Sequence, residues 1–159
     1  MSFSTFSGPV RSGTVKDGTV AGGRNTGLVV LTQSYDTGVV TAGVGNVDAQ
    51  FGNLPQGSQI VDITVDQVVV PGGTSTSTIS VGSASGGAQL MAAVATTAGG
   101  RFRGTATATT QLAWQTSTSA DTALWVRYAV GTAAGVGRAI ITVSYVQRLS
   151  DGSQVPASA

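Results

Sequence analysis

The stretch QIVDITVDQVVVPGGTSTSTISVG, residues 59–82, indicates the fold class of this chain. Before Pro71, apolar side chains recur at alternate positions, as on one face of an extended strand; they are Val61, Ile63, Val65 and Val69. Polar residues fill the positions between, and after Pro71-Gly72-Gly73, which favours a turn, a second alternating run covers 74–82. We therefore expect a hairpin of two strands whose dry face is covered by the rest of the chain.

The composition favours strands over helices. Charged residues make up 9% of the 159 residues, against about 25% in ordinary globular domains. Every acidic residue is Asp and the only lysine is Lys16, so the charged residues that helices prefer are scarce. Because this length suits a single core, we expect one all-β domain.

The charge and the missing residue types argue against several classes of function. A formal net charge of +1 gives no long-range field for nucleic acid or an anionic membrane, so we expect neither as a partner. With no His and no Cys, the chain lacks the residues of Ser-His-Asp catalysis, Cys-His catalysis and zinc sites. It also lacks a signal-peptide pattern at its start and any long apolar run, so we expect synthesis in the cytosol.

Asp62 and Asp66 are the carboxylates best placed for chemistry. They share one strand face about 13 Å apart, which is too far for a shared proton. A calcium site completed by Thr64 and loop carbonyls is the alternative, but two carboxylates are few for that cation. We expect a solvated strand face, and we predict no catalytic residue, no metal site and no cofactor, so that the chain is not an enzyme.

The chain divides into an extended N-terminal arm (1–25), a β-sandwich domain (26–148) and a flexible C-terminal tail (149–159). The arm is rich in Gly and Ser and has no sustained periodicity. In the domain, the apolar run at 28–31 predicts a strand buried on both sides or lying between arm and core, and a further short strand is expected near 38–42.

Later segments complete the expected sandwich. Residues 88–96 have fair helix propensity and predict a short helix or a loop over the sheets. Residues 98–104 are interpreted as a surface loop, with an Arg/Gly segment that tracks nucleic acid as the alternative. Alternation predicts strands at 105–116, 122–130 and 139–147, in a meander or in one sandwich sheet. We therefore expect an antiparallel two-sheet sandwich, jelly-roll-like as first choice and immunoglobulin-like as second.

Aromatic residues are the candidates for contacts with other proteins. Phe3 and Phe6 are unusual in a solvated arm, so we expect them to fill an apolar slot on a partner or neighbouring subunit. The alternative is that they pack on their own domain or stay disordered. If the residues on either side of Trp125 face inwards, Trp125 points outwards beside Arg127, as an interface anchor within reach of a cation–π contact. The alternatives are that Trp125 lies under the second sheet or that it stacks on a bound sugar.

Four segments resemble small virion structural proteins of tailed bacteriophages. They are FSGPVRSGTVKDGT at 6–19, TGLVVLTQS at 26–34, LPQGSQIVDITVD at 54–66 and TSTSTISVG at 74–82. The resemblance covers residues 1–82 well, and the later half matches in its Thr/Ala/Val character and in ITVSYVQ at 141–147. It implies a β-sandwich that decorates or cements the capsid shell as a homotrimer, with the major capsid protein and copies of itself as partners.

On that basis we expect Phe3, Phe6 and Arg11 to contact the shell, and Trp125 and Arg127 to lie at a subunit interface. The protein would be made in the host cytoplasm and reside on the capsid exterior. A receptor- or glycan-binding module of a tail or head fibre is the alternative, although the loops are mostly Gly, Ala, Ser and Thr. A polysaccharide hydrolase needs two carboxylates at a defined separation, which the seven scattered Asp do not visibly provide.

Overall fold

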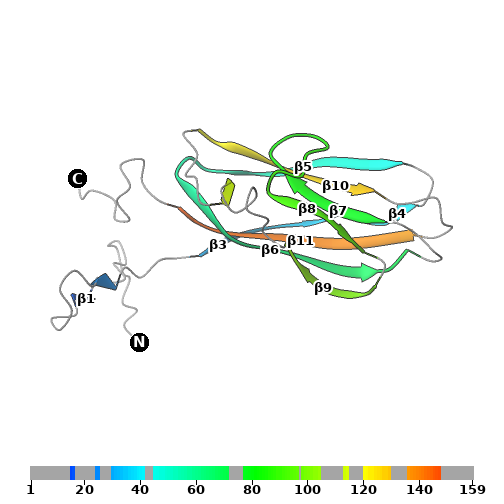
Figure 1. The fold of residues 1–159 in the computed structure, drawn as a ribbon, viewed down its shortest axis with the longest axis horizontal. Coiled ribbons are helices and arrows are strands. Elements are labelled where there is room, and N and C mark those ends of the chain that lie inside the picture. Colours follow the sequence, from blue (N-terminus) through cyan, green and yellow to red (C-terminus); the bar gives the residue numbers. More distant parts are fainter. Residues whose placement is uncertain are drawn as a thin grey trace, which may run out of the picture.

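Apart from a separate two-stranded sheet of residues 15–16 and 24–25, the described chain is a β-sandwich of two antiparallel sheets that face each other along a common long axis (Figure 1). The computed structural model describes residues 15–16, 24–25, 30–41, 45–71, 77–96, 98–104, 113–114, 120–129 and 136–147. Its strands are β1 (Val15–Lys16), β2 (Arg24–Asn25), β3 (Leu31–Asp36), β4 (Val40–Thr41), β5 (Asn46–Leu54), β6 (Ser58–Val69), β7 (Thr78–Gly82), β8 (Met91–Ala95), β9 (Gly100–Arg103), β10 (Thr122–Ala129) and β11 (Val136–Gln147).

The strand order is that of a jelly roll. One sheet runs β3-β11-β6-β9, with β4 also paired to β11, and the other runs β5-β10-β7-β8. Apart from β4, the first and last strands of the described sandwich are neighbours in one sheet, and the second and second-to-last are neighbours in the other. Such pairing of chain ends, carried through both sheets, produces the two Greek keys of a jelly roll. The expected two-sheet antiparallel sandwich is therefore confirmed.

The core lies between the central strands of the two sheets. Most side chains that are almost completely buried come from β6, β7, β10 and β11, with Met91 from β8; those on the four central strands are Ile63, Val65, Ile79, Val81, Leu124, Val126, Tyr128, Ala139, Ile141 and Val143. Along β10 and β11 the buried positions alternate with half-buried ones, as predicted from the sequence. On one side the two sheets are joined through β3 and β5, where Gln33 Nε2 donates to the Asn53 carbonyl at 2.7 Å and Tyr35 stacks on Phe51.

The predicted hairpin of residues 59–82 is wrong. β6 pairs with β11 and β9, whereas β7 pairs with β10 and β8 in the opposite sheet. The chain therefore passes from one sheet to the other between Val69 and Thr78. Local alternation is the same in both arrangements, because each strand buries one face in the same core.

Two irregularities also interrupt the alternation expected for β6. Its register against β11 shifts beside Val61 and again beside Val68, so each of these residues has no direct partner. Val61 and Val69, predicted to face the core, are 51% and 37% exposed, while Gln67 is buried. Gln67 Nε2 donates to the Tyr128 hydroxyl at 2.9 Å, so a polar side chain takes a core position with a partner from the other sheet.

Several predictions for single segments need correction. Residues 91–95 form β8 rather than a helix, and 100–103 form β9 rather than a surface loop. In the expected strand 105–116, the two described residues, Ala113 and Trp114, are helical. The predicted strands at 122–130 and 139–147 are present as β10 and β11, but they lie in different sheets and do not form a meander.

The N-terminal part of the sandwich is partly as expected. β4 confirms the short strand near 38–42. β5 was missed, because Gly45 and Gly52 obscure its alternating pattern. The apolar run at 28–31 is described only in its last two residues, Val30 and Leu31, which are exposed rather than buried. In the described part of the chain, no helix is long and apolar enough to cross a membrane.

Candidate interaction surface

The outer face of the β3-β11-β6-β9 sheet carries ion pairs between neighbouring strands. Asp66 on β6 accepts two hydrogen bonds from Arg101 on β9, at 2.7 and 3.0 Å, and Asp62 lies 3.2 Å from Arg103. The Arg101 guanidinium lowers the pKa of Asp66 below its usual value, because the bond stabilises the carboxylate. The face with Asp62 and Asp66 is solvated, as predicted, but both carboxylates are paired. Arg101 and Arg103 thus serve strand pairing between β9 and β6.

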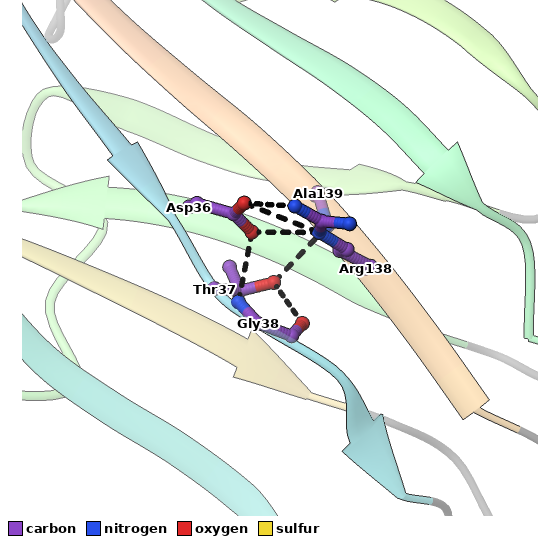
Figure 2. A network of polar contacts seen from close by, with 5 residues as sticks. All are labelled: Asp36, Thr37, Gly38, Arg138 and Ala139. Carbon is purple, nitrogen blue, oxygen red and sulfur yellow. Dashed lines mark hydrogen bonds and ion pairs between the residues drawn. The ribbon is translucent and has the colours of Figure 1, made fainter.

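A second polar network fixes the corner where β3 ends (Figure 2). Arg138 of β11 donates to both carboxylate oxygens of Asp36, and the Gly38 amide donates to Asp36 Oδ1 at 2.9 Å. Thr37 exchanges backbone and side-chain bonds with Ala139, each at 3.0 Å. Gly38 has φ +64°, a conformation that suits glycine at this turn. Arg138 and the Gly38 amide lower the pKa of Asp36 from 3.8 to about 2.

The corner sets the direction of the residues that follow it. With the end of β3 held to β11, β4 pairs with the start of β11, where Val40 lies opposite Gly137. Val40 is buried in the core, whereas Val39, immediately before it, is 65% exposed. The network therefore presents an apolar side chain to solvent on the outer face of the sheet.

Trp125 and Arg127 are the predicted interface residues that the structure describes. Leu124 and Val126 are buried, so Trp125 and Arg127 project from the outer face of the other sheet, as expected. The alternative that places Trp125 under the second sheet is wrong. Arg127 donates to both oxygens of Asp48 at 2.8 Å, which lowers the pKa of that carboxyl. Arg127 thus has a partner within the chain, and its role at an interface stays a prediction.

Exposed aliphatic side chains form two groups at opposite ends of the first sheet. One group, Val39, Val69 and Val136, surrounds Arg138. The other, Val30, Leu31 and Val61, lies where β3 begins and β11 ends, since Leu31 is paired with Tyr145. The sequence predicted none of these residues as surface candidates. The β-branched side chains of the valines among them suit strands in general, so composition gave no sign of which would be exposed.

The acidic side chains in the described part of the chain are engaged within the fold. Among them, no group of three or more acidic, His or Cys side chains could hold a metal ion. Asp36, Asp48, Asp62 and Asp66 are each paired with an arginine, and Asp121 accepts the Gln56 amide at 2.9 Å. Phe3, Phe6 and Arg11, predicted to contact a capsid, lie outside the described residues.

The described chain is thus a two-sheet jelly roll whose outward charges are paired between strands. No protein-family model and no curated protein sequence matches the chain. Among solved structures, the chain is similar to a chain of the capsid of Ralstonia phage GP4, with a TM-score of 0.59 and 23% identity over 77% of this chain and 86% of that chain. It is also similar to a chain of the capsid asymmetric unit of cyanophage Pam1, with a TM-score of 0.50 and 27% identity over 80% of this chain and 91% of that chain.

These similarities bear first on the fold. Two chains from phage capsids share the sandwich over most of their own length. Each therefore consists of little beyond the region that this chain matches.

Proposed function

We propose that this chain is a non-enzymatic structural protein of a bacteriophage virion, which decorates or cements the capsid shell from its exterior. The observation that carries the proposal is the fold shared with capsid chains of two phages, over 86% and 91% of those chains. The paired carboxylates are consistent with it, because they leave no acid or base poised for catalysis among the described residues. Its partners would be the major capsid protein and further copies of itself, as a homotrimer.

The proposed contacts divide between the arm and the sandwich. β3 begins and β11 ends at the same end of the sandwich, because Leu31 pairs with Tyr145. Val30, Leu31 and Val61 are exposed at that same end. We assign this end as the base that faces the shell, where burial of apolar side chains would add to the contacts of the arm. The arm would contribute Phe3, Phe6 and Arg11.

The interface between copies would use the other sheet. Trp125 is half-buried on its outer face, beside an Arg127 held by Asp48. A tryptophan beside a paired arginine is typical of the centre of a protein interface, because neither group is left as an unpaired charge when water is removed.

Labelling of intact virions with a gold-conjugated antibody against this protein tests the proposed location by electron microscopy. Label spread over the head supports the capsid role. Label confined to the tail would contradict it and favour a receptor- or glycan-binding module, which a glycan array would then examine.

A pair of deletions tests the arm. Removal of residues 2–12 should abolish binding to purified shells while leaving the far-UV circular dichroism spectrum of the sandwich unchanged. The matched control removes residues 149–159, a segment of equal length that carries no aromatic residue, and should still bind. Retained binding by the first variant would contradict the role of the arm.

A further inference from the structure

The register of three strands places an apolar patch on the outer face of the first sheet. Val40 and Gly137 are opposite one another and face the core, so Val39 and Val136 face outwards. Val69 is directly opposite Arg138, whose side chain also points out. The three valines are 65%, 37% and 42% exposed in chain order, and we call Val39, Val69 and Val136 with the Asp36–Arg138 pair the valine patch.

The valine patch differs from the rest of this outer face. Further along the same strands the outward positions are mostly Thr, Ser and Asp, as in the bond between Ser34 and Thr142 at 3.0 Å and the pairs made by Asp62 and Asp66. An apolar group of this kind beside a polar surface marks a contact site more often than chance exposure. Val68, next to Val69, is 51% exposed. Together with Val68 the valine patch exposes roughly 300 Å² of apolar surface.

The charges at the centre of the valine patch make it complementary to itself. Arg138 and Asp36 lie side by side, with their side chains 41% and 40% exposed. Two copies related by a two-fold axis could place Arg138 of each beside Asp36 of the other, while each charge keeps its partner in its own chain. Burial of such a neutral pair avoids the large cost of burying an isolated charge.

We propose that the valine patch is a contact between two copies of this chain, in which the valines pack together and Arg138 of each copy meets Asp36 of the other. The patch is small against the roughly 800 Å² per partner of a stable complex, so the contact is weak for free protein. Weak contacts between identical copies gain strength when the copies are held close together, as on a shell. The expected gain in strength on a shell therefore rests on the proposed function. The valine patch also lies at the end of the sheet opposite the base, so both contacts can form at once.

Single cysteines test the proposal, because the chain has no native cysteine. Val39→Cys, Val69→Cys and Val136→Cys are each oxidised as purified full-length protein at high concentration. The matched control is Val61→Cys, an exposed valine at the other end of the same sheet. At least one patch variant should give about tenfold more disulfide-linked dimer than the control, since a disulfide needs Cβ atoms about 4 Å apart. Equal yields at all four positions would overturn the proposal.

Charge reversal tests the reciprocal pairing. Arg138→Asp and Asp36→Arg should each lose the cross-link when combined with the best patch cysteine, because two like charges then face each other. A mixture of the two variants should recover it as a heterodimer. Loss without recovery, in variants whose circular dichroism is unchanged, would overturn the proposal. A disulfide between a patch cysteine and Phe6→Cys, formed in place of the disulfide between two patch cysteines, would also overturn it. All of these measurements use free protein, so a tail location on virions would refute the proposed function and leave this result standing.

Discussion

Substitution of Gly137 by alanine should destabilise the sandwich more than any other single added methyl group at the end where β11 begins. Tyr128, from β10 in the opposite sheet, reaches across the core to the backbone of β11 at Gly137. A Cβ atom at Gly137 would lie 2.8 Å from Pro71 Cγ and 3.0 Å from Tyr128 Cζ, with the Tyr128 hydroxyl closer still. Real Cβ atoms almost never lie that near, so the ring or the strand must move.

The magnitude follows from what that movement disturbs. Overpacking a well-filled core costs about 1–3 kcal/mol. The Tyr128 hydroxyl also accepts a hydrogen bond from Gln67 Nε2 at 2.9 Å, in a position where Gln67 is buried. Weakening that bond adds about 1 kcal/mol. We therefore expect Gly137→Ala to lower the free energy of unfolding by about 2–4 kcal/mol, a large part of the 5–15 kcal/mol typical of a domain.

Urea denaturation followed by tryptophan fluorescence measures this change. The midpoint should fall while the slope of free energy against urea stays the same. Gly99→Ala is the matched control, because its Cβ would meet only Val70 Cγ2 at 3.4 Å, an ordinary contact. The control should lie within about 0.5 kcal/mol of the wild type.

A double-mutant cycle with Tyr128→Phe separates the two contributions. Without the hydroxyl the ring leaves more room, so Gly137→Ala should cost less in the Tyr128→Phe background, with a coupling of about 1 kcal/mol or more. If Gly137→Ala matches the Gly99→Ala control, or if the two changes simply add, the reasoning about this contact is refuted.

Three further changes test other parts of the structure. The folded-state pKa of Asp36 is about 2, against 3.8 when unfolded, so its contribution to stability is present above pH 4 and lost as the pH falls towards 2. Over that range the urea midpoint of Asp36→Asn should therefore fall less steeply with pH than that of the wild type. An equal dependence of the midpoint on pH in both proteins would contradict the assignment. The buried hydroxyls of Ser77 and Thr96 bond at 3.0 Å, so Thr96→Val alone should cost about 1–3 kcal/mol by thermal or urea unfolding. Ser77→Ala with Thr96→Val should recover most of that loss, and a double variant no better than the single one would count against it. Trp125→Ala should weaken self-association, measured by sedimentation, at least about tenfold without lowering the urea midpoint of the monomer. Unchanged self-association would show that Trp125 does not lie at the interface.

The long, regular strands could be predicted from the sequence. β10 and β11 each keep strict alternation over most of their length, and burial follows it residue by residue. The outward direction of Trp125 follows from the same pattern. The jelly-roll class was also predictable, because a chain with many alternating segments and few helix formers leaves few arrangements.

Partner choice between strands could not be predicted, because it depends on residues far apart in the chain. The segment 88–96 has helical composition, yet β8 forms because its residues pair with β7 and Met91 is buried against the core. β9 was mistaken for a loop, because Arg101 finds Asp66 at a sequence separation of 35 residues. The Asp36–Arg138 pair at the centre of the valine patch spans 102 residues.

Scarce charge and pairing between strands have a joint consequence for assembly. Arginines on β9, β10 and β11 each contact an aspartate on a neighbouring strand. At exposed positions such pairs add little to stability, so their value to the fold alone is small. They do, however, leave the described strands of both sheets without isolated charges, which are the groups that cost most to bury against another protein. Another protein can therefore bind to either face, at the valine patch or around Trp125, without burying an unpaired charge.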